Sequence, residues 1–377
     1  MSLTQERPAS PGRLLAGWGR TAASRAQVTG PLPLPRLQAL VAGRPARGVL
    51  ARGAGSSYGD AAQNAGGSVL APASGPHLEL DTAAGTMRAA GSATVTQLLA
   101  ACVPHGLLLP VLPATRHVTL GGAVASDVHG RNQRADGSLG SWIEEIELLD
   151  GTGEVRRLAA GSEEFRATVG GLGLTGVILA VTLRLLRIRS GLLTVTTRRH
   201  AGLDALLAAM DATRDRYCVA WVDTSAAGRS LGRGILESAD HLAGPDPATE
   251  AGGLAYRPPR SRRAPRLPVC PLTPWSVREF NGLHFRAAPE DDSGLTDLAG
   301  FFHRLDAIEA WNRLPGPRGF VHYQFVVPDG TPGLLAEVLE TVQRHRCPSF
   351  LGTLHRFGVQ GTGQLSFAQP GLALARL

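Results

Sequence analysis

A glycine-rich segment in the first sixth of the chain has the composition of an anion-binding loop. It reads Ala51-Arg-Gly-Ala-Gly-Ser-Ser-Tyr-Gly-Asp60 and begins within a strand predicted over residues 49–53. Glycines at 53, 55 and 59 leave the backbone open, so several amide N–H groups can converge on a phosphate. The same composition is also typical of ordinary turns. The spacing is not a dinucleotide-binding fingerprint, because Tyr58 stands where G-x-G-x-x-G needs its last glycine and no apolar helix follows.

A second segment, PATRHVTLGGAVASDVHG over residues 113–130, combines two adjacent glycines with a histidine. We predict a short helix that begins at Thr119, with Gly121 and Gly122 in its first turn, where backbone N–H groups attract a phosphate. His129 is a candidate for acid–base chemistry, although a lone histidine is more often structural.

A third segment, GLGLTG over residues 171–176, does match G-x-G-x-x-G. A dinucleotide-binding fold requires a helix after this motif, but the sequence continues as VILAVTLRL, which is typical of a strand. We therefore interpret the segment as a turn that closes over a cofactor.

The elements that must position these segments are short strands and amphipathic helices. Residues 94–106 predict a helix that ends at Gly106, residues 143–158 a hairpin around Asp150-Gly151, and residues 177–188 a long strand. Beyond residue 190 we predict helices over 203–214 and 331–347, strands over 218–224 and 320–328, and a mobile arginine-rich loop over 257–268. The fold class is α+β rather than a regular βαβ series, with one domain over 1–190 and another over 191–377.

Composition excludes several classes of protein. The 377 residues carry a formal charge of +7, and all 38 basic residues are arginine, since the sequence contains no lysine. No stretch interleaves aromatic residues with the arginines, so we expect no nucleic-acid partner. Four widely spaced cysteines predict neither a metal site nor a disulfide framework. Residues 1–13 lack the apolar core of a signal peptide, and no run of about 18 apolar residues predicts a transmembrane helix.

Several motifs in order resemble one known family. ARGAGSSYGDAAQNAGG (51–67), PATRHVTLGGAVASDVHGRN (113–132) and ATVGGLGLTGVIL (167–179) resemble the FAD-binding domain of the vanillyl-alcohol-oxidase superfamily. AGWGRTA (16–22), AWNRLPGPRGFVHYQFVVP (310–328) and QLSFAQPG (364–371) are similar to its decaprenylphosphoryl-β-D-ribose 2-oxidase family. The resemblance implies a two-subdomain FAD-binding domain, followed by an α+β substrate domain built on an antiparallel sheet.

The resemblance also implies which residues contact FAD. They are Ala51, Arg52, Gly53, Ala54, Gly55, Ser56, Ser57, Tyr58, Gly59, Asp60, Ala61, Ala114, Thr119, Leu120, Gly121, Gly122, Ser126, Asp127, Val128, His129 and Ile178. Many relatives attach FAD through a histidine in the first loop. The matching position here is Ser56, so the implied FAD is non-covalent.

The implied reaction is hydride transfer from a sugar CH–OH group to the flavin, which gives a ketone in arabinan precursor synthesis. The resemblance places His129 and Tyr58 beside the flavin as catalytic residues, and Trp221, Gln324 and His355 on the substrate side. Side-chain alternation points Tyr323 away from the site. Two alternatives stay open: an FAD-linked alditol or aldonolactone oxidase, and a flavin-binding fragment without activity.

The sequence departs from the family at two places. A family lysine aligns with His355, and Arg356 follows it. The family chain continues past SFAQPG into a return segment with an active-site tyrosine and lysine, whereas this chain reads GLALARL to Leu377. We therefore expect an incomplete substrate domain with an unpaired sheet edge.

The implied partners are a polyprenyl-phosphate sugar as substrate and a ketoreductase that takes the product onward. The arginine-rich loop over 257–268 suggests peripheral contact with anionic lipid, against the plainer interpretation of a solvated loop. The expected location is cytoplasmic or at the cell envelope.

Overall fold

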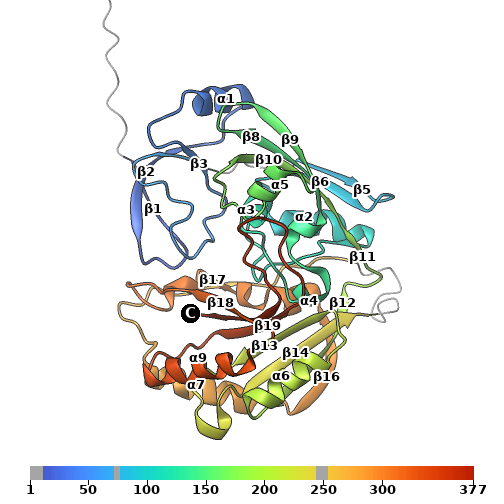
Figure 1. The fold of residues 1–377 in the computed structure, drawn as a ribbon, viewed down its shortest axis with the longest axis vertical. Coiled ribbons are helices and arrows are strands. Elements are labelled where there is room, and N and C mark those ends of the chain that lie inside the picture. Colours follow the sequence, from blue (N-terminus) through green and yellow to red (C-terminus); the bar gives the residue numbers. More distant parts are fainter. Residues whose placement is uncertain (1–11, 72–76, 243–253) are drawn as a thin grey trace, which may run out of the picture.

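The computed structural model describes residues 12–71, 77–242 and 254–377. The prediction that the chain has no signal peptide rests on residues 1–13, and most of these lie outside the described ranges. Two sheets form the N-terminal half of the molecule, and one large sheet with its helices forms the C-terminal half below it (Figure 1). The predicted mixture of helices with antiparallel sheets is confirmed.

The first sheet of the N-terminal half has the strand order β1-β2-β4-β3 and is partly parallel. Its strands are β1 (Arg13–Ala16), β2 (Ala23–Thr29), β3 (Val49–Ala51) and β4 (Ser68–Leu70). The second sheet is antiparallel, in the order β5-β6-β10-β8-β9. Its strands are β5 (Leu78–Asp81), β6 (Thr86–Ala90), β8 (Ile143–Asp150), β9 (Val155–Ala159) and β10 (Gly176–Arg184).

Five short helices accompany these two sheets. They are α1 (Leu34–Ala42), α2 (Val95–Cys102), α3 (Leu120–Ala125), α4 (Gln133–Asp136) and α5 (Glu163–Thr168). The predicted helix at 94–106 is confirmed as α2 with a following 3-10 turn, η1 (Val103–His105). Thr94 and Gln97 form a capping box at its start, and Gly106 ends the turn with φ 70°.

The predicted hairpin over 143–158 is confirmed as β8 and β9. Asp150 Oδ1 accepts hydrogen bonds from Thr152 N at 2.8 Å and Glu154 N at 3.2 Å, which closes the turn. The segment over 171–176 leads directly into β10, so the strand-like interpretation is confirmed and the dinucleotide-fold alternative is excluded. A small pair, β7 (Leu107–Leu108) with β11 (Leu186–Arg187), follows at the end of this half.

The C-terminal half is built on a seven-stranded antiparallel sheet in the order β16-β12-β14-β13-β19-β20-β18. The strands are β12 (Leu192–His200), β13 (Tyr217–Val222), β14 (Gly234–His241), β16 (Asp291–Asp297), β18 (Tyr323–Pro328), β19 (Gly352–Phe357) and β20 (Gly371–Arg376). The helices are α6 (Leu203–Ala212), α7 (Pro274–Ala287), α8 (Leu298–Phe302) and α9 (Pro332–Arg344). The 3-10 turns of this half are η3 (Gly228–Ser230), η4 (Arg304–Ala307) and η5 (Trp311–Arg313), whereas η2 (Leu139–Trp142) belongs to the N-terminal half.

Residues 371–376, expected to depart from the family pattern, form strand β20 between β19 and β18. Leu372, Ala373 and Leu374 in this strand are buried. The core beneath α6 and α9 includes two of them, Leu372 and Leu374. These residues therefore contribute to the sheet rather than fraying from it.

The arginine-rich segment over 257–268 differs from the predicted free loop. Arg262 and Arg263 form strand β15, which pairs in parallel with β17 (Ile308–Glu309). Arg263 Nε also lies 3.4 Å from Glu309 Oε1. Sequence composition could not reveal this pairing, because the partner strand lies more than forty residues along the chain.

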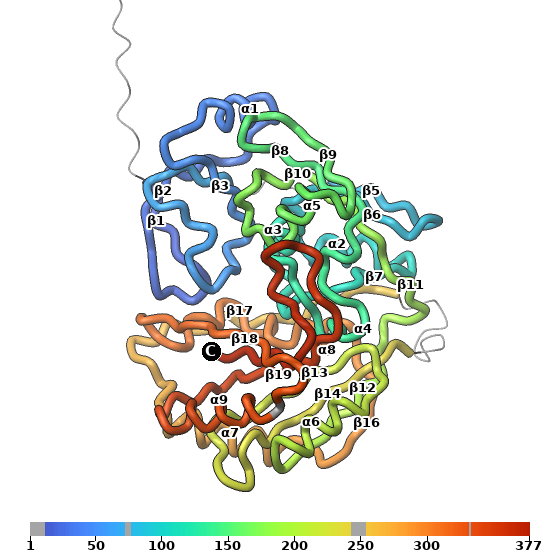
Figure 2. The backbone as a smooth tube through the Cα atoms, in the orientation of Figure 1, coloured from blue at the N-terminus to red at the C-terminus, as the bar shows by residue number. Residues whose placement is uncertain are grey.

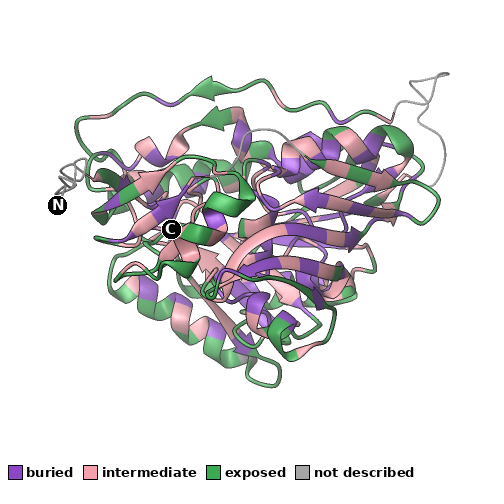
Figure 3. Ribbon diagram, turned by 90° about the horizontal axis from the view of Figure 1, so that it is seen from above, coloured by how far each residue is buried: buried purple, intermediate pink, exposed green. Residues whose placement is uncertain are grey.

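The two halves are joined by packing and by one long hairpin. The largest core continues from Leu98 and Phe165 in the first half to Tyr217 and Phe301 in the second. The connection between β19 and β20, drawn in dark red, rises from the large sheet to the region of α3 (Figure 2). Where this connection leaves β19, Gln133 Oε1 of α4 accepts a hydrogen bond from Gly358 N at 2.9 Å. The burial pattern, with mostly buried strands inside and exposed helix faces outside, is visible in Figure 3.

Candidate active site

A cavity of about 1440 Å³ lies between the two halves of the molecule. The glycine-rich loop and the 113–130 segment line one side, and strands β13, β18 and β19 contribute Trp221, Gln324 and His355 to the other. Single-ligand pockets typically enclose about 300–1,000 Å³. This volume therefore suits a cofactor together with a substrate.

The glycine-rich loop presents its backbone to the cavity. Among the residues that the structure describes, the amide N–H groups of residues 53–59 have no hydrogen-bond acceptor. The loop is held from behind by Arg52, which donates to Ala62 O at 2.8 Å and to Ala16 O at 2.7 Å. A phosphate is the kind of group that such free donors fit, because it supplies several acceptor oxygens.

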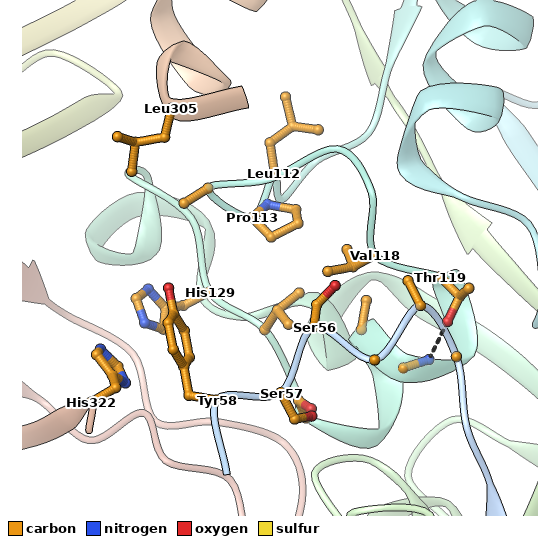
Figure 4. Close-up of a pocket in the computed structure, with 18 of the residues that line it drawn as sticks. Ser56, Ser57, Tyr58, Leu112, Pro113, Val118, Thr119, His129, Leu305 and His322 are labelled. Carbon is orange, nitrogen blue, oxygen red and sulfur yellow. Dashed lines mark hydrogen bonds between the residues drawn. The ribbon is translucent and has the colours of Figure 1, made fainter. Parts of the chain in front are cut away.

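Close backbone approaches explain why glycine occupies this cradle. A Cβ at Gly53 would lie 2.2 Å from Thr119 Oγ1, and one at Gly91 would lie 2.2 Å from Ile178 O. Thr119 is itself fixed, because it is buried and its Oγ1 accepts a hydrogen bond from Gly122 N at the start of α3 (Figure 4). The predicted helix start at Thr119 is confirmed. The cradle therefore fits the FAD that the sequence implies.

Replacing Gly53 with alanine should weaken FAD binding at least tenfold, because the added methyl group must displace the Thr119 cap and shift the loop. The Gly59→Ala variant is a matched control, since a Cβ there meets no atom within 4 Å. Titration of the apoprotein with FAD, followed by flavin fluorescence, measures both affinities. Equal affinities for the two variants would contradict this role of Gly53.

His129 contacts both halves of the molecule. Its Nε2 lies 3.0 Å from Gln324 Nε2 of β18, and the amide donates this bond when the imidazole proton is on Nδ1. Its ring packs edge-on against Phe357 at 4.7 Å and His355 at 5.4 Å between ring centroids. The pKa of His129 is lowered to about 4, mainly by burial; Gly130 and Asp127 oppose this effect, and nearby His322 adds to it. The imidazole is therefore neutral at physiological pH.

Tyr58 lies beside His129 at the end of the glycine-rich loop, and Figure 4 shows His322 next to both. The rings of Tyr58 and His322 stack with centroids 4.5 Å apart. Burial raises the pKa of Tyr58 and lowers the pKa of His322. At neutral pH the phenol therefore keeps its proton and the imidazole stays uncharged.

The predicted substrate-side residues lie in the same cavity. Trp221 Nε1 donates to Phe350 O at 3.1 Å, which fixes the indole on the sheet. Burial lowers the pKa of His355 well below its usual value, and His129 and Arg131 add to this effect. Tyr323 does not line the cavity and is 63% exposed, as the predicted alternation requires.

Most predicted flavin contacts line the cavity, but three do not. Gly59 and Asp60 do not belong to the cavity lining, and Leu120 is buried in the core, where its N–H donates to Ala93 O at 2.7 Å. The lining residues that sequence reasoning missed include Arg131, Glu237, Arg304 and His322. Arg131 and His322 lie within two of the quoted motifs, whereas no local signal marks Glu237 or Arg304.

Buried neutral histidines predict that folding stability falls in mild acid. Burial lowers the pKa of His129 and of His303 to about 4, while an unfolded histidine titrates near 6.5. The unfolded chain then binds more protons between pH 6.5 and 4, so stability is lost as the pH falls through this window. We expect about 2 kcal/mol per histidine between pH 7 and 5. Urea midpoints at these two pH values test this, and a pH-independent midpoint would contradict it.

Comparisons with known proteins agree with this arrangement. A family model described as an FAD binding domain matches residues 38–159. Decaprenylphosphoryl-β-D-ribose oxidase of Mycolicibacterium smegmatis is 35% identical over 385 residues, which cover 98% of this chain and 83% of the relative. An uncharacterized protein from the mprA 5′ region of Streptomyces coelicolor is 36% identical over a segment that covers 75% of this chain and 80% of that protein. An alditol oxidase of a Streptomyces species is 33% identical over 38% of this chain and 35% of that enzyme.

The fold and the cavity define an FAD-dependent oxidoreductase. The chain belongs to the decaprenylphosphoryl-β-D-ribose oxidase family, as its match to the mycobacterial relative along nearly its whole length shows. Among the described residues, no group of three or more histidine, cysteine or acidic side chains is arranged to hold a metal ion. No described helix is long and apolar enough to span a bilayer.

Proposed function

We propose that this protein oxidises a CH–OH group of a sugar carried on a polyprenyl phosphate, the ribose 2-hydroxyl, to a ketone. The observation that carries the proposal is the 3.0 Å contact between His129 and Gln324. In this contact a neutral imidazole of the N-terminal half meets an amide of the C-terminal half inside one cavity. The relative named for decaprenylphosphoryl-ribose supports this choice of sugar.

In this proposal the two sheets of the N-terminal half, residues 1–190, are subdomains that hold FAD between them. Residues 191–377 form the substrate domain. The free amides of residues 53–58 would hold the pyrophosphate, and Gly121, Gly122 and Ile178 would border the flavin. Ser56 supports non-covalent attachment of FAD. It stands where many relatives have a histidine bonded to the flavin, and a serine does not form that bond.

Bound FAD supplies the acceptor for the hydride that leaves the sugar carbon. His129 would accept the hydroxyl proton at Nε2 when the substrate hydroxyl takes the place of the Gln324 amide at this nitrogen. Gln324 orients the imidazole and binds the same sugar. Tyr58, protonated at neutral pH, donates a hydrogen bond to the substrate, and Trp221 and His355 close the opposite wall.

The rest of the cavity suits the lipid part of such a substrate. Pro271, Leu272, Val277, Phe280 and Ile308 line it and are apolar. Burial of a prenyl tail against these side chains contributes about 25 cal/mol per Å² of apolar area. This wall distinguishes a lipid-linked sugar from a free polyol.

The alternative substrate class is a free alditol or aldonolactone. The local match to an alditol oxidase favours it, although that match covers a little over a third of this chain. Incubation of the FAD-loaded protein with farnesylphosphoryl-ribose, ribitol and an aldonolactone, each analysed by mass spectrometry, separates the classes. A product two mass units lighter from farnesylphosphoryl-ribose alone supports the proposal. Oxidation of ribitol alone contradicts it, and no turnover of any compound with FAD bound supports the inactive alternative.

Peripheral membrane contact remains part of the proposal. Trp275 and Leu283 on α7 are strongly exposed, and Phe280 on the same helix lines the cavity. The neighbouring arginines of residues 257–268 would contact anionic headgroups at the cytoplasmic or envelope side of a membrane. Flotation with anionic and neutral liposomes tests this, and equal binding to both contradicts the role of the arginines.

A ketoreductase that consumes the product stays a prediction.

A further inference from the structure

Three charged side chains form a cluster in the wall of the cavity. Glu237 of β14 accepts from Arg131 Nη1 at 3.1 Å through one carboxylate oxygen, and from Arg304 Nη1 at 2.7 Å through the other. All three residues line the cavity. Two guanidinium groups against one carboxylate leave a net charge of +1 in this wall.

The cluster is partly removed from water, so its excess charge acts strongly inside the cavity. The side chains of Arg131 and Glu237 are only 21% and 14% exposed. The Arg131 guanidinium also lies 4.3 Å from the centroid of the Phe301 ring. Burial raises the pKa of Glu237, but Arg131 and Arg304 outweigh it and hold the pKa below its usual value. The carboxylate is therefore ionised and positions both arginines.

Donors remain free on both arginines. Among the described residues, Arg131 Nε and Nη2 and Arg304 Nη2 have no hydrogen-bond partner. Arginine forks match phosphate oxygens with paired, charge-assisted bonds. The cluster therefore has both the charge and the donors to bind a singly charged phosphate diester.

The cluster also lies at the right place along the cavity. Arg131 follows His129 by two residues, and its charge reaches His355, whose ring is 5.4 Å from that of His129. Arg304 is 59% exposed and precedes Leu305 and Ile308, which line the apolar part. The cluster thus has His129 and His355 close to Arg131, and residues of the apolar lining close in sequence to Arg304.

We infer that Arg131 and Arg304, held by Glu237, form the subsite for the phosphate group of the substrate. This inference rests on the proposed function and adds to it the residues that bind the phosphate. It also accounts for the histidine at position 355, where the family has a lysine, because Arg131 already places positive charge close to this residue.

The test compares the variant Arg304→Gln with the parent protein, both loaded with FAD. Arg304 is exposed, so its replacement should not prevent folding, and Arg156→Gln on β9 is the control because that arginine forms only a surface pair with Glu164. We expect Arg304→Gln to raise the KM for farnesylphosphoryl-ribose at least tenfold, with little change in kcat. The KM for methyl β-D-ribofuranoside, which has no phosphate, should not change.

Calorimetric titration with farnesyl phosphate gives a second measurement that needs no turnover. The parent should bind it, and Arg304→Gln should bind at least tenfold more weakly, while Arg156→Gln should match the parent. Equal affinity in all three proteins would overturn the subsite. The subsite would also be overturned if Arg304→Gln raised the KM for farnesylphosphoryl-ribose and the KM for methyl β-D-ribofuranoside by the same factor. That result would indicate a structural role of Arg304. If the parent binds farnesyl phosphate but oxidises no ribose compound, the proposed function fails while the subsite stands.

Discussion

Replacing His129 with alanine should lower kcat about 10²- to 10⁴-fold, the range typical of a lost acid–base group. His129 is the imidazole that faces both Gln324 and the aromatic wall of Phe357 and His355. The alanine removes the proton acceptor without touching the glycine-rich loop, so FAD should remain bound. Stopped-flow reduction of the bound flavin by substrate measures the affected step directly.

A matched control uses His345, an exposed histidine at the end of α9, whose alanine variant should behave as the parent. Gln324→Leu should lower kcat about tenfold, because the imidazole then loses the hydrogen bond that orients it. The double variant should be no slower than His129→Ala alone, since Gln324 acts through His129. Flavin reduction at the parental rate in His129→Ala would show that another group accepts the proton.

Because burial lowers the pKa of His129 to about 4, the reaction should be insensitive to pH between about 6 and 8. A rate that rises with a midpoint near 6.5 would contradict the burial of this imidazole.

The largest loss of stability is expected for Asp127→Ala, at about 3–5 kcal/mol. The Asp127 carboxylate is buried and accepts hydrogen bonds from Ser138 Oγ and Gly140 N, each at 2.8 Å, and from Ser366 Oγ. Alanine leaves all three donors without this acceptor. Ser366 belongs to the long connection between β19 and β20, so the change also releases this connection from the first half of the molecule.

The conservative variant Asp127→Asn separates the causes. Asp127 has a φ of 40°, which asparagine adopts more readily than alanine does, and the amide oxygen can still accept. We expect it to lose roughly half as much stability as Asp127→Ala. Asp329→Ala is the control, because Asp329 forms an exposed pair with Arg356 and should cost less than about 1 kcal/mol. Urea unfolding in saturating FAD measures all three, and a loss below 1 kcal/mol for Asp127→Ala would contradict its role in joining the halves.

Local sequence was sufficient for several elements of the fold. The capping pair Thr94 and Gln97, the stop at Gly106 and the turn at Asp150 act within a few residues, so their positions could be predicted. The dinucleotide-binding interpretation of the motif over 171–176 could be rejected for the same reason, since the residues after the motif favour a strand. The full set of predicted flavin contacts came from the resemblance of several motifs, in the same order along the chain, to those of a known family.

Long-range pairing could not be predicted in this way. The strand at Arg262–Arg263 depends on residues 308–309, and the place of residues 371–376 between β19 and β18 depends on both of these strands. Such pairings are decided by packing and hydrogen bonds between distant segments, which leave no local pattern.

Local residues are enough to locate the glycine-rich loop, the residue types of the candidate site and the family that they resemble. The contacts of His129 with Gln324, of Tyr58 with His322, and of Glu237 with Arg131 and Arg304 depend instead on packing between distant segments. A glycine loop or a capped helix forms from neighbouring residues. A cavity between two halves depends on how distant strands are packed, and that packing also sets the burial that keeps His129 neutral.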